Sequence, residues 1–323
     1  MRLLSWLICG IALSNAALLW AAPHTRERIT QIHIPVWMEP KAAGSDVQTD
    51  DPAPEDFHAT LDGSETRVLS IQCPDDDLII LLVLDLSSDD LTVADPAKDT
   101  LASEIRKLPP KTYVGLLRAQ DGLQVLVDPT ADRDALINAI QQQTLSGKTG
   151  LLNTVDTIGR IADAMLKKSD VRIGVVYITD GDVRNYREDF ANPVINSSDS
   201  HDLSRRFPET LVQEKIAKLE TTLARQQTPL FIVNLTQRGG RLSEAYQNGM
   251  KQLAETTAGT AFFSPTSTEI PGQIRRCLEA VRSHYSLTLA LPERVSARPQ
   301  IHLTVPDGDR LLSYRTRLVL KER

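Results

Sequence analysis

The stretch Leu78-Ile79-Ile80-Leu81-Leu82-Val83-Leu84, followed by Asp85-Leu86-Ser87-Ser88-Asp89, decides the fold. Seven consecutive apolar residues predict a strand that is buried on both faces, as in a parallel sheet covered by helices. Open α/β sheets bind their ligands at the carboxyl ends of such strands. A carboxylate and two hydroxyls directly after the apolar run therefore indicate a ligand site at that edge of the sheet.

The region around this strand alternates apolar runs with segments of helical periodicity, which is typical of a doubly wound α/β domain. We assign the domain to residues 75–283, with strands at 78–84, 113–119, 123–128, 171–179, 229–235 and 260–264. The predicted helices are 97–107, 131–142, 151–167, 209–226, 241–257 and 267–283. Because Gln120-Asp121-Gly122 is short enough for a hairpin, we expect a mostly parallel six-stranded sheet with one antiparallel edge strand.

Strand-like segments on both sides of this domain predict a small β subdomain formed by the N- and C-terminal segments. Residues 26–74 contain an alternating stretch at 29–37, a turn at Leu61-Asp62-Gly63-Ser64 and a strand at 66–72. Residues 284–323 contain expected strands at 285–291, 300–305 and 314–321, the last two separated by an Asp307-Gly308-Asp309 turn. Since the two ends of such a domain lie near each other, we expect these segments to pack together.

The charge balance argues against a nucleic-acid partner. The 323 residues carry 36 Lys and Arg against 42 Asp and Glu, a net charge of −6, and no basic cluster stands out. The chain is long enough for one large core and a smaller domain.

Residues 1–22 predict a secretory signal peptide or an uncleaved membrane anchor. Met1-Arg2 precede an uncharged apolar stretch, and Ala21-Ala22 follow it. A stretch of about 18 apolar residues is near the lower limit for crossing a membrane, so both alternatives stay open. In either case we expect an exported protein, in the periplasm, on the cell surface or secreted, whose only membrane contact is this segment.

Two cysteines, Cys73 and Cys277, lie beyond residues 1–22. An exported protein meets an oxidising compartment, so we expect a disulfide between them that ties the two ends of the α/β domain together. Two unpaired buried thiols are the alternative.

Oxygen-bearing side chains occur on three loops that follow or precede the predicted elements. Asp85, Ser87 and Asp89 follow the first strand, Thr149 comes directly before a helix, and Asp180 follows the strand at 171–179. Carboxylates, hydroxyls and waters are the ligands that hard divalent cations prefer. The alternative is a degenerate site in which Asp85 only caps the following loop by hydrogen bonds.

These loops resemble the von Willebrand factor type A family. The resemblance covers residues 78–283 and is carried by Asp85-Leu86-Ser87-Ser88-Asp89, Gly147-Lys148-Thr149-Gly150-Leu151-Leu152 and Ile178-Thr179-Asp180-Gly181. More narrowly, the chain is similar to exported bacterial "VWFA-related" proteins of the acidobacterial type, through segments 54–63, 259–263 and 282–287.

The resemblance implies a metal-ion-dependent adhesion site that recognises a protein ligand, without catalysis and without a small-molecule cofactor. The implied cation is Mg²⁺, with Ca²⁺ or Mn²⁺ as alternatives. Its implied ligands are Asp85, Ser87, Asp89, Thr149 and Asp180.

One residue departs from the family pattern, because Asp89 stands where a second Ser is expected. A third carboxylate beside a divalent cation would change the summed charge from zero to −1. That change weakens the attraction for an acidic partner group and favours Ca²⁺, which tolerates more oxygen ligands than Mg²⁺.

The polar stretch from residue 181 to 208 is long for a connection between a strand and a helix. It begins beside Asp180, so we expect it to overhang the implied metal site and to determine which partner binds. The candidate partner-binding residues are Asp182, Arg184, Arg187 and His201. An insertion without a role is the alternative.

Enzymatic interpretations have less support. Ser146-Gly147-Lys148-Thr149 lacks the earlier glycine of a phosphate-binding loop and follows a helix instead of a strand. Neither a Gly-x-Ser-x-Gly nor a His-Glu-x-x-His pattern occurs. Three hypotheses remain: a metal-bridged protein-binding module, a metal-independent scaffold, and a metal-dependent hydrolase that uses Asp85 and Asp180.

Overall fold

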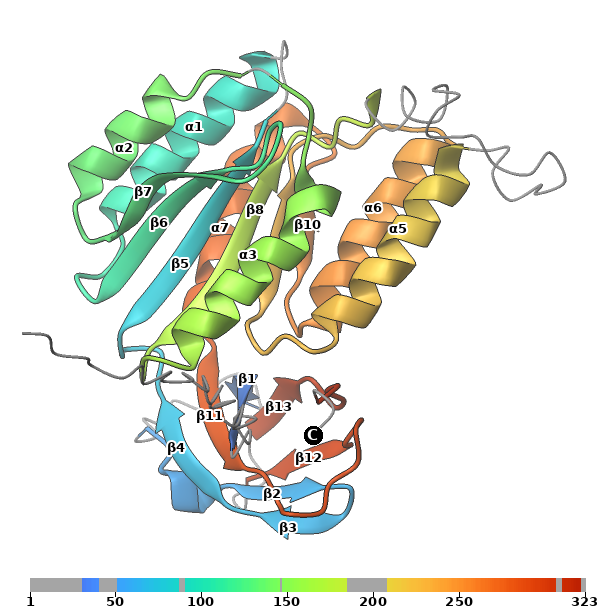
Figure 1. Ribbon diagram of the computed structural model, residues 1–323. Helices are drawn as coiled ribbons and strands as arrows, with labels where there is room; N and C mark the ends of the chain where they lie inside the picture. The colour runs from blue at the N-terminus through green and yellow to red at the C-terminus, as the bar shows by residue number, and fades with distance from the viewer. Residues whose placement is uncertain are drawn as a thin grey trace, which may run out of the picture.

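The computed structural model describes residues 31–40, 51–86, 91–145, 147–184, 208–305 and 310–320. Within these ranges the chain forms a large α/β layer and a smaller β layer that lies below it in Figure 1. The smaller layer contains two antiparallel sheets, and both combine strands from the N-terminal and C-terminal parts of the chain. The expected packing of the two ends is therefore confirmed.

The α/β layer is built on one mixed sheet. Six strands of the described chain form it in the order β10-β9-β8-β5-β6-β7. All neighbours pair in parallel except β7, which is antiparallel to β6, so the predicted fold class is confirmed. The strands are β5 (Leu78–Asp85), β6 (Thr112–Arg118), β7 (Gln124–Thr130), β8 (Arg172–Thr179), β9 (Leu230–Asn234) and β10 (Ala261–Phe263).

Helices cover both faces of this sheet, as the doubly wound pattern requires (Figure 1). Alternate residues of β5 face opposite sides, so Ile80 packs with α1, α2 and α7, whereas Leu81 packs on the side of α3, α5 and α6. The helices are α1 (Leu91–Arg106), α2 (Arg133–Gln142), α3 (Leu151–Leu166), α5 (Pro208–Leu223), α6 (Arg241–Thr256) and α7 (Ile270–Arg282).

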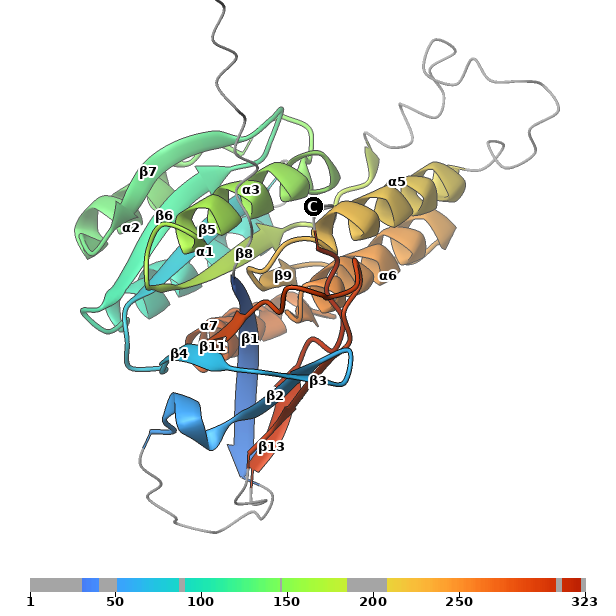
Figure 2. The ribbon, with the colours of Figure 1, turned by 60° about the horizontal axis from the view of Figure 1, so that its bottom comes forward.

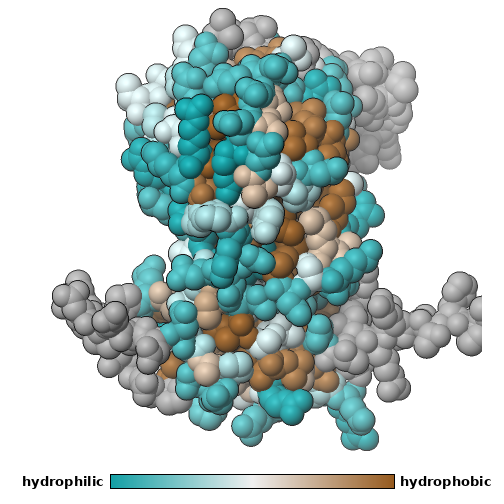
Figure 3. All heavy atoms as spheres, turned by 90° about the vertical axis from the view of Figure 1, so that its left-hand side faces the viewer, coloured by the Kyte–Doolittle hydropathy of each residue, from teal (hydrophilic) through white to brown (hydrophobic). Residues whose placement is uncertain are grey.

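The outer strand β7 carries a mixture of exposed apolar and polar side chains. Its Val125 is 54% exposed, and Pro129 lies near its end. A proline has no amide hydrogen to donate, which an edge strand tolerates. Figure 3 views the molecule from this side and shows a mostly hydrophilic surface with separate hydrophobic patches. No helix of the described ranges is long and apolar enough to cross a membrane.

The strands of the smaller layer agree only in part with those predicted from the sequence. One sheet has the order β13-β1-β11-β4 and the other β12-β2-β3, and Figure 2 brings this layer forward. The strand predicted at 314–321 is wrong, because the strand at this place is β13, which ends at Tyr314 and is followed by an irregular segment tied to the α/β layer. The strands are β1 (Gln31–Pro40), β2 (His58–Leu61), β3 (Ser64–Thr66), β4 (Val68–Gln72), β11 (Tyr285–Ala290), β12 (Ile301–Thr304) and β13 (Arg310–Tyr314), and short 3₁₀ turns lie at Pro54–Asp56 and Ser267–Glu269.

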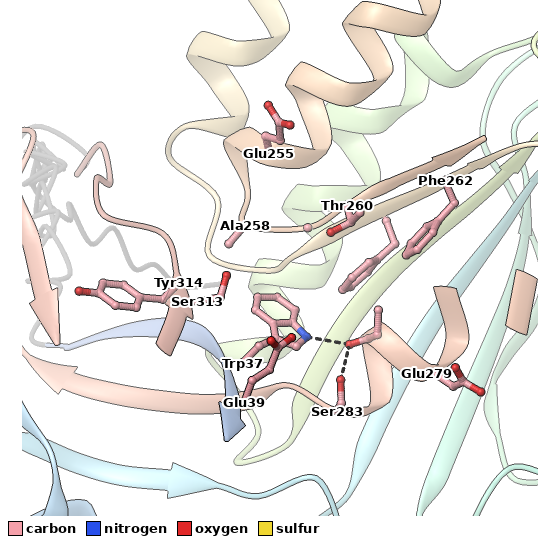
Figure 4. Close-up of a pocket in the computed structure, with 13 residues that line it drawn as sticks. Trp37, Glu39, Glu255, Ala258, Thr260, Phe262, Glu279, Ser283, Ser313 and Tyr314 are labelled. Carbon is pink, nitrogen blue, oxygen red and sulfur yellow. Dashed lines mark hydrogen bonds between the residues drawn. The ribbon is translucent and has the colours of Figure 1, made fainter. Parts of the chain in front are cut away.

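Trp37 joins the two layers. Its indole Nε1 donates a hydrogen bond of 2.9 Å to the carbonyl of Ala280 on α7, and its ring meets Phe231 of β9 edge-on at 6.1 Å. A cavity of about 590 Å³ lies beside this contact, between β1, β13 and the loop that leads into β10 (Figure 4). Aromatic and glutamate side chains line it, among them Glu39 and Glu279.

The predicted disulfide is wrong, because Cys73 and Cys277 are both free. Cys277 is fully buried on α7, where it belongs to the apolar core between that helix and the sheet. Cys73 lies half-buried directly after β4, in the segment that crosses from the β layer to β5. The alternative of two unpaired thiols therefore holds, with only one of them fully buried.

Candidate functional site

Asp85 ends β5 and is fully buried at the carboxyl edge of the sheet. Its Oδ1 accepts a hydrogen bond of 2.7 Å from the backbone amide of Gly150. Its Oδ2 accepts bonds from the amide of Leu151 at 3.3 Å and from Thr179 Oγ1 at 3.0 Å. Both carboxylate oxygens are thus used to hold neighbouring elements in place. Asp85 caps the start of α3, not the loop that follows β5.

Gly150 lets α3 begin directly against the sheet. A Cβ at this position would lie 1.8 Å from the carbonyl oxygen of Ala119, so no side chain fits. The free amides at a helix N-terminus carry partial positive charge and stabilise a nearby carboxylate. The short glycine therefore brings these amides to Asp85, and it fixes Thr149 next to the same point.

Thr149 and Asp180 lie on two other loops at the same edge of the sheet as Asp85, and we call these three residues the cup. The hydroxyl of Thr149 is buried and donates to the carbonyl of Asp182 at 3.0 Å. Asp180 follows β8, and its Oδ1 accepts from the amide of Asp182 at 3.1 Å. The structure thus brings Asp85, Thr149 and Asp180 together at one edge of the sheet, as the sequence predicts.

Burial dominates the electrostatics of Asp85. Removal from water raises the pKa of its carboxyl from 3.8 to about 7, and the nearby charge of Asp180 acts in the same direction. The hydrogen bonds from Gly150, Thr179 and Leu151 oppose this rise because they stabilise the carboxylate. The protein therefore compensates for this buried charge with backbone amides and one hydroxyl.

Four of the predicted site residues, Ser87, Asp89, Arg187 and His201, lie outside the described residues. Within the described ranges, no group of three or more His, Cys, Asp or Glu side chains is arranged to hold a metal ion. The proposed metal site is therefore described only through Asp85, Thr149 and Asp180.

Asp182 and Arg184, two of the predicted partner-binding residues, differ in their exposure. Arg184 Nε lies 2.8 Å from Asp182 Oδ2, and Arg238 lies 3.8 Å from Asp182 Oδ1. The Asp182 side chain is only 8% exposed, whereas that of Arg184 is 58% exposed. Asp182 therefore helps to build the wall of the cup, and Arg184 is the one of the two that a ligand can reach.

Two residues at the end of β9 also support the cup, and the sequence interpretation missed them. Thr236 Oγ1 donates to the carbonyl of Asp180 at 2.5 Å, and Asn234 Nδ2 donates to the carbonyl of Thr236 at 2.5 Å. The signal was present, because Asn234 directly follows the apolar run 230–233 and so marks another strand end at the same edge.

The side-chain atoms that Asp85, Thr149 and Asp180 could offer to a metal ion are all oxygens, the atom type that hard divalent cations bind. The Asp85 oxygens already accept three hydrogen bonds, so Asp85 acts as a positioning residue. The Thr149 hydroxyl donates its hydrogen to the carbonyl of Asp182, and a hydroxyl oxygen is an atom type that can also bind a cation. In kind, therefore, Thr149 and Asp180 fit such an ion.

Comparison with known proteins gives fold-level matches. No protein-family model matches the sequence, and no curated protein matches it significantly. A von Willebrand factor type A protein from Catenulispora acidiphila is 11% identical, with 92% of this chain and 76% of that chain covered and a TM-score of 0.45.

Two further solved structures are similar to this chain at a comparable level. The von Willebrand factor domain of a type V pili tip protein from Porphyromonas gingivalis is 12% identical, with 64% and 95% of the two chains covered and a TM-score of 0.43. Proximal thread matrix protein 1 from the mussel byssus, with a zinc-occupied adhesion-site motif, is 12% identical over 66% and 50% of the chains, with a TM-score of 0.42. At these identities and TM-scores the likeness carries no conclusion about function. The sheet order and the helices on both of its faces are those of a doubly wound α/β domain with an added β layer.

Proposed function

We propose that this chain is a protein-binding module whose partner docks at the strand-end cup of Asp85, Thr149 and Asp180. The observation that supports the proposal most is the pair of bonds from the Gly150 and Leu151 amides to the buried Asp85 carboxylate. They fix the start of α3 against the end of β5, and Thr149, directly before α3, bonds to the carbonyl of Asp182 in the loop that contains Asp180. Such a fixed set of polar groups at this edge of an open α/β sheet is a ligand site by position.

In this proposal a divalent cation completes the cup, with Mg²⁺ expected and Ca²⁺ or Mn²⁺ as alternatives. Thr149 and Asp180 hold it, and Ser87 and Asp89 are the further oxygen donors that the sequence provides. The bound cation would offer an open coordination position to an acidic group of the partner. In this arrangement Asp85 holds the start of α3 in place, and the exposed side chain of Arg184 contacts the surface of the partner.

A metal-independent scaffold is the second candidate, and one observation favours it. The Asp85 carboxylate is satisfied by protein donors, so the edge of the sheet is held together without an ion. In this case the partner would contact the surface around Arg184 directly.

We propose no catalytic step for either candidate. In particular, Asp85 is a poor candidate for a general base, because its carboxylate already accepts three hydrogen bonds from the protein. Export, predicted from residues 1–22, belongs to the proposal, and it places the partner in the cell envelope or outside the cell.

A capture experiment separates the candidates. The tagged full chain is exposed to the envelope fraction of its native cells, with and without EDTA, beside Asp180→Asn and a control. The control is Asp134→Asn, an exposed carboxylate on α2. The metal-bridged proposal expects one partner that EDTA and Asp180→Asn both remove and that Asp134→Asn retains. Capture that survives EDTA supports the scaffold, and capture that Asp180→Asn leaves unchanged contradicts the metal-bridged proposal.

A further inference from the structure

A second polar site lies at the other end of α3, away from the cup. A cavity of about 520 Å³ opens between the C-terminal ends of α3 and α5 and the segment after β13. Six charged side chains line it, four cationic and two anionic, in a chain whose net charge is −6. They are Arg160, Lys167, Lys168, Arg225, Asp156 and Asp163.

Both carboxylates of the cavity already have protein partners. Asp163 Oδ1 accepts from the amides of Gln227 and Thr228 at 3.0 and 3.1 Å, which ties α3 to the loop before β9. Asp156 Oδ2 lies 3.3 Å from Nε of Arg160, one turn away on the same helix. Asp163, Asp156 and Arg160 therefore already interact with other groups of the protein.

The other three cations form no close ion pair with a described residue. Lys167, Lys168 and Arg225 are exposed, and none of them has an ion-pair partner within 4.0 Å among the described residues. The charge of Lys167 also stabilises the nearby Asp163 carboxylate, but with four cations against two carboxylates the cavity keeps a positive potential that attracts anions.

One wall of the same cavity is apolar and firmly attached. Val319, Leu320 and Ala164 of α3 are its apolar lining residues. The amide of Val319 donates to the carbonyl of Ala224 at 2.9 Å, and the half-buried Arg315 guanidinium donates to the carbonyl of Gln226 at 2.6 Å. The wall is thus held against the α5–β9 loop and has a fixed shape.

We propose that this cavity binds a small organic anion. Its carboxylate or phosphate head lies between Lys167, Lys168 and Arg225, and its apolar body lies against Val319 and Leu320. The volume is within the range of about 300–1,000 Å³ that is typical of small-molecule sites, and a bare inorganic anion would leave the apolar wall uncovered. This site is separate from the cup, so it does not depend on the proposed function.

Calorimetric titration of the full chain with matched probes tests the proposal. Hexanoate and hexyl phosphate carry both the charge and the apolar body, 1-hexanol lacks the charge, and inorganic phosphate lacks the body. We expect the two hexyl anions to bind at least ten-fold more tightly than the other two, with an affinity that falls as NaCl is added. The ratio between hexanoate and hexyl phosphate identifies the head group.

Two variants locate the binding. Lys167→Gln with Lys168→Gln should weaken both hexyl anions at least ten-fold. The same two-charge change at the exposed Lys111 and Lys218 should not weaken them. Ala164→Phe fills the apolar part while keeping every charge, so it should also abolish binding, and it decides the matter if the double variant unfolds.

Four results would overturn the proposal: equal binding of 1-hexanol, no binding of any probe at millimolar concentration, equal loss in the Lys111 and Lys218 control, or full binding in a folded Ala164→Phe variant.

Discussion

The carboxylate of Asp85 accepts a hydrogen bond of 2.7 Å from the backbone amide of Gly150, which is 65 positions later in the chain. This bond joins the end of the central strand β5 to the start of α3 inside the buried edge of the sheet. It makes Asp85 a structural anchor of the cup, and it fixes Thr149, which directly precedes Gly150, at the same edge of the sheet.

Asp85→Ala should lower the free energy of unfolding by about 1–3 kcal/mol, because it leaves the amides of Gly150 and Leu151 buried without an acceptor. Asp85→Asn keeps one acceptor oxygen and should cost less. Urea unfolding followed by circular dichroism measures both variants. An Asp85→Ala protein within about 0.5 kcal/mol of the wild type would mean that the anchor has no energetic weight.

Gly150→Ala should be destabilising by about 1–3 kcal/mol, because the new Cβ would lie 1.8 Å from the carbonyl of Ala119 and must push α3 off the sheet. Gly239→Ala is the matched control, since its Cβ would meet no atom within 4 Å. The same unfolding measurement compares the two, and equal stabilities would show that α3 can move without cost.

The pH dependence of stability should carry the signature of buried neutral His284. Burial, and secondarily the charge of Arg172, lowers the pKa of this imidazole from 6.5 to about 3. Between these values the unfolded chain binds a proton that the folded protein does not, so stability falls as the pH falls. The contribution of neutral His284 to the free energy of unfolding is complete above pH 6.5. It decreases by about 1.4 kcal/mol per pH unit toward pH 3.

Unfolding measured at pH 7 and pH 5 checks this prediction. The raised pKa of Asp85 acts in the opposite direction in this range, because there the folded protein binds the proton. Relative to the wild type, His284→Gln should therefore be more stable at pH 5 than at pH 7, whereas His58→Gln, at an exposed position, should leave the difference between the two conditions as in the wild type. A difference that persists unchanged in His284→Gln would assign the pH dependence to other groups.

Arg172 should be irreplaceable by Lys. Its buried guanidinium donates to the carbonyls of Arg282 and His284 from one nitrogen and to those of Pro74 and Asp76 from the other. It thereby fastens both chain segments that cross between the α/β layer and the β layer. A lysine ammonium has three donors without this fork, so Arg172→Lys should cost about 2 kcal/mol or more.

Thermal unfolding of Arg172→Lys, beside the exposed Arg160→Lys, measures this cost. A melting temperature equal to that of Arg160→Lys would show that the four carbonyls do not need the guanidinium.

The α/β layer could be predicted from the sequence because its signals are local. The apolar run 78–84 needs two covered faces, and the apolar face of α3 recurs at helical spacing. The last strand was misplaced because the segment after Tyr314 is apolar enough for a strand, yet Arg315 and Val319 bond to the α5–β9 loop instead of to a sheet.

The shared position of Asp85, Thr149 and Asp180 at one edge of the sheet was predictable from the sequence, but their hydrogen-bond partners were not. Strand-end position identified Asp85 and Asp180, but the sequence could not show that Gly150 allows contact with Ala119 or that α3 points its amides at Asp85. Nor could it show that Cys277 faces the core on α7, away from the half-buried Cys73. Such facts depend on how elements far apart in the chain pack together.

Isothermal titration of Mg²⁺, Mn²⁺ and Ca²⁺ into the full chain tests the metal-bridged cup most directly. It should be run beside Thr149→Ala, with Thr221→Ala as a control at an exposed position on α5. We predict saturable binding of at least one ion in the wild type and in Thr221→Ala, and a loss of at least ten-fold in affinity in Thr149→Ala. The absence of heat with all three ions, or equal binding in a folded Thr149→Ala protein, would contradict the proposal that Thr149 and Asp180 hold a cation.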